Sequence, residues 1–101
     1  MLNVQRLRVF TEVLARGSFS AAAESLSYTQ SAVSQAIARL ESETGATLVV
    51  RDRRRVRPTP AGATLVAHAE EIFGRVEAAE ADLAAVLKGL GARPLEHALG
   101  R

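Results

Sequence analysis

The segment 51–57 concentrates the basic side chains of this sequence. It reads Arg-Asp-Arg-Arg-Arg-Val-Arg, so five arginines stand beside a single aspartate. Residues 1–50 hold as many arginines as acids, and residues 58–101 hold more acids than basic residues, so the net charge of +2 arises in this short segment. Arginine clamps phosphates and inserts into narrow minor grooves of nucleic acid. The candidate contact residues are Arg53, Arg54 and Arg55 at the tip of a predicted hairpin, with Arg51 beside them.

Charged hairpin tips also occur simply because they keep edge strands from aggregating. Five arginines in seven residues exceed that need, so we interpret the segment as an anion-binding surface. Arg51 and Arg57 have a second possible role, which is to orient the hairpin or to reach the flanking backbone.

A second group of candidates lies on a predicted helix that starts near residue 30. Val33, Ile37 and Leu40 share one face, and small polar side chains lie on the opposite face. Serine and glutamine can hydrogen-bond base edges in a major groove, and glutamine can pair two-fold with adenine. An exposed helix face is often polar for solubility alone, but such a face usually carries lysine and glutamate, which this one lacks. The candidate DNA contacts are Thr29, Gln30, Ser31, Ser34, Gln35 and Arg39.

Helix signals position these residues. Asn3 is a fair N-cap for a first helix that Gly17 ends, with an apolar stripe of Val4, Leu7, Phe10, Val13 and Leu14. Ser18 or Ser20 can cap a short second helix, in which Ala22, Ala23 and Leu26 face inward. Ser27 or Thr29 can cap the third, and we favour Thr29 because it leaves a short turn between two helices. That arrangement is typical of a helix-turn-helix, and Gly45 would end the third helix.

A hairpin and one long helix complete the pattern. Residues 47–50 form a short β-branched run, and Val56 and Arg57 can return as a second strand around the arginines, which predicts a wing. Thr59 and Pro60 form a strong helix start, because proline tolerates the first helical position. We therefore predict a mainly α fold, a winged helix-turn-helix of three helices and a two-stranded wing followed by a long helix.

The long helix carries apolar residues spaced alternately by four and three, as in a heptad seam. At 1.5 Å per residue it would be about 45 Å long, too long to bury itself against so small a domain. We expect it to form a homodimer with a second copy. The seam consists of Leu65, Ala69, Ile72, Val76, Ala79, Leu83, Val86 and Leu90. The predicted division is residues 1–58 for DNA binding, 59–90 for dimerisation, and 91–101 as a tail or truncated linker.

Composition excludes several other classes. The sequence has no cysteine, and His68 and His97 lie far apart, so we expect neither disulfides nor a metal site, and no cofactor. The sequence shows no nucleophilic side chain together with a general base, so we do not expect an enzyme. No apolar run reaches the length of a membrane span and the first residues lack a signal peptide, so the expected location is cytoplasmic.

The residues together form a pattern with fixed spacing. It consists of Leu7-x-x-Phe10, Gly17-Ser18-Phe19, Ala22-Ala23-x-x-Leu26, Gln30-Ser31-Ala32-Val33-Ser34-x-x-Ile37-x-x-Leu40-Glu41, Gly45, Leu48-x-x-Arg51 and Thr59-x-Ala61-Gly62. This pattern resembles the amino-terminal part of LysR-type transcriptional regulators without gaps from residue 2 to about residue 65, and the long helix resembles the family's linker helix.

The resemblance implies a homodimer whose recognition helices enter successive major grooves of an inverted-repeat operator, with the wings in flanking minor grooves. By motif position, Gln30, Ser31, Ser34 and Gln35 resemble the family's base and phosphate contacts, and Arg53 or Arg54 its wing arginine. The sequence departs from the family at three positions: Val49 replaces phenylalanine, Ser31 replaces proline and Pro58 replaces leucine. Because proline lacks a backbone N–H, we expect a short second strand.

Family members usually continue into a periplasmic-binding-protein-like effector domain, so we expect either a DNA-binding fragment or a protein that stops after its linker helix. Higher assembly than a dimer would then belong to a full-length regulator. Two alternatives stay open from the sequence. One is the DNA-binding domain of another winged-helix repressor family, such as a molybdate-regulator-like domain, and the other is a protein-interaction module that acts through the long helix.

Overall fold

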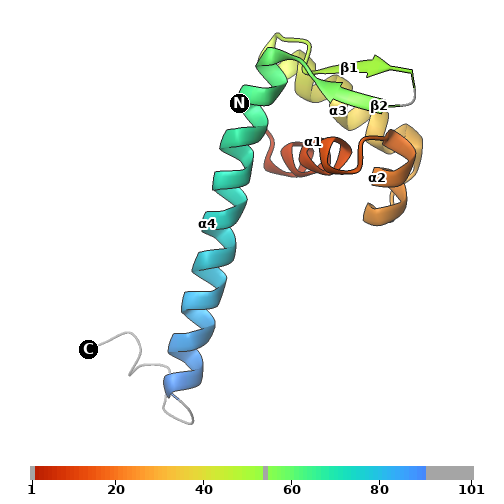
Figure 1. Ribbon diagram of the computed structural model, residues 1–101. Helices are drawn as coiled ribbons and strands as arrows, with labels where there is room; N and C mark the ends of the chain where they lie inside the picture. Colours follow the sequence, from red (N-terminus) through yellow and green to blue (C-terminus); the bar gives the residue numbers. More distant parts are fainter. Residues whose placement is uncertain (1, 54, 91–101) are drawn as a thin grey trace. The chain divides into compact units, whose positions relative to one another are not determined.

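The computed structural model describes residues 2–53 and 55–90 (Figure 1). The predicted roles of Arg54, of residues 91–101 and of the Leu90 side chain lie outside this description. Backbone contacts divide the chain into two compact units, one spanning residues 1–70 and one that begins at Glu71. The elements are α1 (Val4–Arg16), α2 (Phe19–Leu26), α3 (Gln30–Thr44), β1 (Val49–Asp52), β2 (Arg55–Pro58) and α4 (Pro60–Leu90). The predicted fold class, mainly helical with a two-stranded wing, is confirmed.

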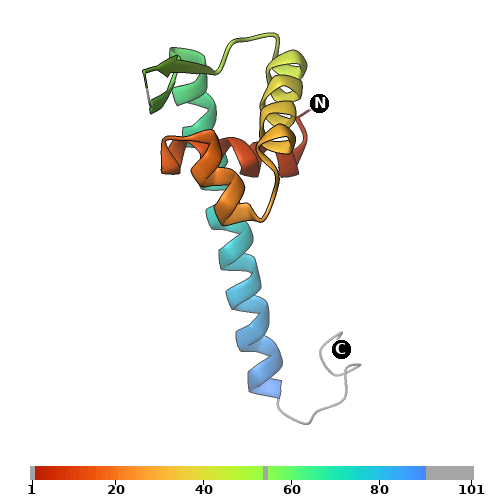
Figure 2. The same cartoon turned by 90° about the vertical axis from the view of Figure 1, so that its right-hand side faces the viewer.

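The first three helices begin at side-chain caps. Asn3, Ser18 and Thr29 each accept a hydrogen bond from the backbone N–H three residues further on, at 3.0, 2.9 and 3.0 Å. Such caps satisfy donors that have no partner inside the helix. Of the two predicted alternatives for α2, Ser18 and not Ser20 is the cap. The prediction that Thr29 rather than Ser27 caps α3 is confirmed. Figure 2 shows the short connection between α2 and α3 that results.

The same three helices end on residues in the left-handed region. Gly17 has φ 74° and Gly45 has φ 71°, a conformation that glycine adopts without strain, and both were predicted as helix ends. Ser27 ends α2 with φ 59° although it carries a side chain. Each of these residues donates its backbone N–H back to the last turn of its helix. Of these three residues, Ser27 lies in the turn between α2 and α3.

The core of the first unit is built from apolar side chains of α1, α2 and α3, of the connection before the wing, of the wing and of α4. They are Leu7, Val9, Phe10, Val13, Phe19, Ala22, Ala23, Val33, Ile37, Leu40, Leu48, Val56 and Ala69. The buried stripe predicted for α3 is confirmed. The stripe predicted for α1 is wrong at Val4, which is 58% exposed, whereas Val9 is buried. The reason is that α1 begins at Val4 and its buried face starts one turn later.

The wing is an antiparallel hairpin that begins later than predicted. Val49 pairs with Pro58 and Asp52 pairs with Arg55, and the strands start two residues after Thr47. Thr47 and Leu48 do not join the ladder, because their carbonyl oxygens accept hydrogen bonds from the side chain and the backbone N–H of Thr59. These two residues form a connection rather than a strand.

The second strand is longer than expected, because Pro58 is its last residue. The N–H of Val56 points away from β1 and donates to the Gly17 carbonyl at 2.9 Å. Alternate residues of a strand direct their N–H groups to the same side, so the nitrogen of Pro58 also faces away from β1. Proline therefore costs no ladder hydrogen bond at this position.

The start of α4 packs tightly against the connection before the wing. Thr59 Oγ1 accepts the N–H of Gly62 at 3.0 Å, which confirms the predicted cap and the helix start at Pro60. A Cβ atom at Gly62 would lie 2.1 Å from the Leu48 carbonyl oxygen, so only glycine fits here. The backbone of α4 thus approaches residue 48 more closely than a side chain would allow.

The rest of α4 exposes apolar side chains. Ile72, Val76, Leu83 and Val86 are between 42% and 59% exposed, whereas Ala69 is fully buried and Leu65 is partly buried. The exposed members repeat at the predicted seam spacing. None of the helices in residues 2–53 and 55–90 is both long enough and apolar enough to cross a membrane.

Candidate nucleic-acid interface

Every residue proposed to read DNA on α3 is exposed. Thr29, Gln30, Ser31, Ser34, Gln35 and Arg39 all lie at the surface, whereas Val33, Ile37 and Leu40 are buried. The hydroxyl oxygen of Thr29 accepts the capping hydrogen bond, so its proton is the group left to donate to a ligand. From Gln30 to Ala38 the helix carries no charged side chain, which leaves a neutral, hydrogen-bonding face.

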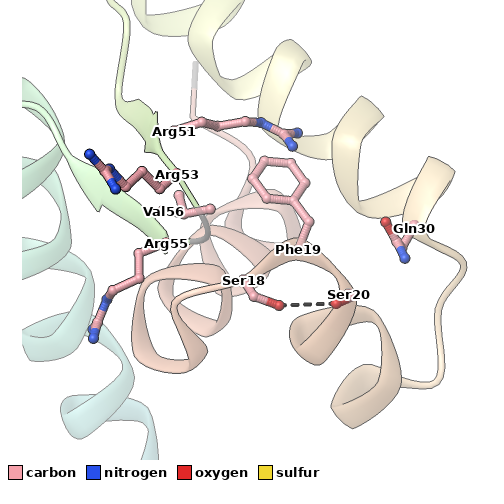
Figure 3. Close-up of a pocket in the computed structure, with 8 residues that line it drawn as sticks. All are labelled: Ser18, Phe19, Ser20, Gln30, Arg51, Arg53, Arg55 and Val56. Atoms are coloured by element: carbon pink, nitrogen blue, oxygen red, sulfur yellow. Dashed lines mark hydrogen bonds between the residues drawn. The ribbon is translucent and has the colours of Figure 1, made fainter.

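The beginning of this helix and the wing share one hollow of about 190 Å³ (Figure 3). Gln30 lines it from α3 and three arginines line it from the wing, although they lie more than 20 residues apart in sequence. The charged side chains that line this hollow are all arginines. The residues that form this basic hollow are Ser18, Phe19, Ser20, Gln30, Arg51, Arg53, Arg55 and Val56.

Two contacts hold the wing beside the start of α2. One is the hydrogen bond from the Val56 N–H to the Gly17 carbonyl. The other is the Arg51 guanidinium, whose central carbon lies 4.1 Å from the centroid of the Phe19 ring. An arginine over an aromatic ring is an attractive cation–π contact. Figure 3 shows Arg51 extended over the ring.

The wing arginines consequently have different surroundings. Arg51 stacks on Phe19, and Arg57 pairs with Asp52 at 3.0 Å. Within the described part of the chain, Arg53 and Arg55 form no ion pair, and both are exposed. Arg53 also has φ 58°, a conformation that side-chain-bearing residues rarely adopt. The two arginines best placed to meet an external anion are therefore Arg53 and Arg55.

Two acidic groups join the helices of the first unit to one another. The pKa of Glu12 lies below its ordinary value because Ser25 of α2 donates a hydrogen bond to the carboxylate and because Arg16 pairs with it at 2.8 Å. The pKa of Glu43 is lowered mainly by the hydrogen bond from Arg6, which links α1 to the end of α3. Both carboxylates are bound to neighbouring helices and so contribute to the scaffold.

Sequence reasoning did not name four of the residues that line the basic hollow as site residues. Val56 was considered only as a strand residue, Ser18 and Ser20 were considered as caps, and Ser18 and Phe19 were noted within the family pattern. The proximity of residues 18–20 to the arginines follows from the Gly17–Val56 hydrogen bond and the Arg51–Phe19 contact, neither of which a local signal predicts. Ser31, Ser34, Gln35 and Arg39 do not line the hollow. Within residues 2–53 and 55–90, no group of three His, Cys, Asp or Glu side chains could hold a metal ion.

A family model described as "Bacterial regulatory helix-turn-helix protein, lysR family" matches residues 4–63. The chain belongs to the LysR family. The match covers the three helices, the wing and the first turn of α4, which are the elements that form the interface. The chain therefore carries the helix-turn-helix DNA-binding domain of a LysR-type regulator, and other winged-helix repressor families are no longer alternatives.

Relatives within the LysR family are regulators rather than enzymes. The chain is 40% identical over 79 residues to the nitrogen assimilation regulatory protein nac of Klebsiella aerogenes, covering 78% of this chain and 26% of that protein. It is similar to the full-length LTTR LysG of Corynebacterium glutamicum, with a TM-score of 0.81 and 32% identity over 86% of this chain and 30% of the other. The chain thus spans about a quarter to a third of the length of these LysR proteins.

A solved LysR-family structure of matching length includes DNA. The structure named "BenM_DBD/benA site 1 DNA Complex" aligns with a TM-score of 0.78 and 29% identity, covering 84% of this chain and 99% of that one. The likeness covers most of this chain, and the structure that it resembles is a complex of a LysR-type DNA-binding domain with DNA.

Proposed function

We propose that this chain binds double-stranded DNA sequence-specifically as a homodimer, and that it is the DNA-binding part of a LysR-type bacterial transcription regulator. In this proposal α3 lies in the major groove of an inverted-repeat operator and the wing arginines contact the flanking minor groove and phosphates. The proposed location is the cytoplasm, where such DNA is found.

The observation that carries the proposal is the basic hollow shared by Gln30 and the wing arginines. A neutral helix face can read base edges but supplies little of the phosphate attraction that dominates affinity. Arg51, Arg53 and Arg55 supply positive charge to the same hollow that Gln30, the first residue of that helix, also lines. One surface therefore combines a group for base readout with groups for phosphate contact, and the likeness to a BenM–DNA complex supports the same assignment.

The proposed division of labour assigns residues 1–58 to DNA and residues 59–90 to dimerisation. The exposed apolar side chains Ile72, Val76, Leu83 and Val86 support the second part, because exposed apolar stripes at heptad spacing are typical of helices that pair. A second copy of this chain would cover them, and two recognition helices would then address two half-sites of a repeat.

Selection of duplexes from a random-sequence library tests sequence-specific binding directly. We expect an enriched inverted repeat, and fluorescence anisotropy with the enriched duplex should give tighter binding than with a scrambled one. Gln30→Ala should relax preference at particular base pairs, because it removes one base-reading amide. Enrichment of no sequence over the library would contradict specific recognition.

A double variant that combines Arg53→Ala with Arg55→Ala tests the proposed phosphate contacts of the wing. These changes should weaken binding to all duplexes and reduce the slope of log affinity against log salt by about 0.9 for each phosphate that is no longer neutralised. A weakening restricted to certain base pairs would instead assign base readout to the wing.

A further inference from the structure

One carboxylate of the recognition helix holds the backbone where the wing begins. Glu41, near the end of α3, accepts hydrogen bonds at Oε2 from the N–H groups of Leu48 at 2.7 Å and Val49 at 3.4 Å. Val49 is the first residue of β1. The helix that carries the proposed base-reading face is thereby joined by its own side chain to the first strand of the wing.

The same stretch of backbone is held from its other side. The Leu48 carbonyl accepts the N–H of Thr59 at 3.0 Å, the Thr47 carbonyl accepts the Thr59 hydroxyl at 2.6 Å, and the Leu48 side chain is buried. The connection between α3 and β1 is thus fixed to the start of α4 and, through Glu41, to α3. Without the Glu41 carboxylate, the N–H groups of Leu48 and Val49 would lose their hydrogen bonds to α3, and only the backbone bonds from Gly45 and Ala46 to the Glu41 carbonyl would remain.

The charge at position 41 is unfavourable unless it makes these bonds. The last turn of α3 contains no basic residue, and a carboxylate at the C-terminal end of a helix is repelled by the helix dipole. The Glu41 carboxylate also lies beside the first residue of the wing, and the arginines of this wing are proposed to contact phosphates. Two backbone N–H donors compensate for this repulsion, because charge-assisted hydrogen bonds are stronger than neutral ones.

We propose that Glu41 is a positioning residue for DNA binding, whose carboxylate fixes the wing relative to α3 so that Arg53 and Gln30 reach one duplex together. The inference rests on the proposed DNA-binding function. Glu41 itself does not touch DNA, and its effect on affinity passes through the wing.

The test measures binding of the full chain to a fluorescent duplex of arbitrary sequence over a range of NaCl concentrations. Glu41→Ala should lower affinity about three- to tenfold at low salt and reduce the salt slope, because a displaced wing no longer reaches the same phosphates. Glu41→Gln has an amide oxygen that can accept hydrogen bonds from the same N–H groups, so its affinity and its salt slope should both lie close to those of the parent. Glu43→Ala is the matched control, since it removes the same charge from the same turn but its partner is Arg6.

A double-mutant cycle separates positioning from an independent effect. If Glu41 acts through the wing, Glu41→Ala and Arg53→Ala should be non-additive, so that the double variant binds only slightly more weakly than either single variant. Glu41→Ala and Gln30→Ala should remain close to additive. Full additivity with Arg53→Ala, or an unchanged salt slope in Glu41→Ala, would overturn the positioning role while leaving DNA binding intact.

Amide hydrogen exchange provides a readout that does not need DNA. Exchange at Leu48 and Val49 should accelerate in Glu41→Ala, return towards the parent rate in Glu41→Gln, and be unaffected by Glu43→Ala. Equal protection of these amides in Glu41→Ala and in the parent would refute the role. A parent chain that binds the duplex without salt dependence would instead refute the proposed function.

Discussion

The Arg51 guanidinium lies over the Phe19 ring, with 4.1 Å between its central carbon and the ring centroid. This contact joins the wing to the first residue of α2, so Arg51 has a structural partner that the described arginines at the tip, Arg53 and Arg55, lack. The four described wing arginines are therefore not equivalent, although their side chains are identical and all lie within residues 51–57. Some hold the hairpin in place and others remain available for an external anion.

Replacing Arg51 by methionine tests the structural part of this division. Arg51→Met keeps an unbranched apolar stem but removes the cation, so the free energy of unfolding should fall by about 0.5–1 kcal/mol, the usual size of an exposed cation–π contact. Arg53→Met is the control in the same hairpin and should leave stability unchanged. Urea unfolding measures both, and equal stability of Arg51→Met and the parent would contradict the structural role.

Arg53 offers a prediction in which stability and binding change in opposite directions. Its φ of 58° costs a residue with a side chain about 1 kcal/mol, which glycine avoids. Arg53→Gly should therefore stabilise the chain by up to about 1 kcal/mol while weakening DNA binding. Arg53→Ala removes the same charge but retains the backbone strain. It should therefore weaken DNA binding as much as Arg53→Gly does, without the increase in stability. Thermal unfolding and anisotropy titrations compare the two variants.

If Arg53→Gly bound DNA as tightly as the parent, the arginine at this strained position would have no role in binding. A strained arginine where glycine is favoured is the kind of feature that function retains at a cost in stability. Comparing Arg53→Gly with Arg53→Ala separates the effect of the backbone strain on stability from the effect of the charge on DNA binding.

Local signals predicted the helices of this fold and their ends. Asn3, Thr29 and Thr59 act through side chains bonded to residues three positions away, so the information lies within one helical turn. The apolar spacing of Val33, Ile37 and Leu40 likewise fixes which face of α3 is buried. These features follow from short-range geometry that the sequence displays directly.

The wing and the basic hollow depended on long-range contacts and were predicted less accurately. The first strand was placed too early because Thr59, twelve residues after Thr47, occupies the carbonyl oxygens there. Likewise, Ser18 and Phe19 lie beside the wing because Val56 bonds to Gly17 and Arg51 stacks on Phe19. Neither contact produces a periodic pattern, so no local signal could reveal it.

The stability of the helical core should depend on pH through Glu12. Its pKa is lowered in the folded chain by the Ser25 hydrogen bond and by Arg16, so the folded state favours the ionised carboxylate more than the unfolded state does. The resulting stabilisation is fully present above the unfolded pKa of about 4.3 and is lost as the pH falls through the lower folded value.

Urea unfolding at neutral and acid pH measures this contribution. Glu12→Gln should reduce the free energy of unfolding at neutral pH. It should also make the decrease of that free energy below about pH 5 smaller, because the side chain at position 12 no longer titrates. Ser25→Ala should give a smaller change in the same direction, since it removes the first cause of the lowered pKa but leaves Arg16. An acid-induced loss of stability as large in Glu12→Gln as in the parent would exclude Glu12 as its source.

The exposed seam of α4 predicts a dimer that one substitution can dissociate. Leu83 is 59% exposed and occupies a seam position, so Leu83→Glu would place a carboxylate where a second copy is expected to pack. Burying an unpaired charge in an apolar contact is strongly unfavourable, and light scattering at micromolar concentration should find a monomer.

Ala81→Glu is the matched control, because it adds the same side chain to the same helix at an exposed position off the seam. It should remain dimeric. If Leu83→Glu had the same mass as Ala81→Glu and the parent, the apolar spacing along α4 would have another cause than pairing. If the parent itself were monomeric at micromolar concentration, the prediction that α4 forms a homodimer would be wrong.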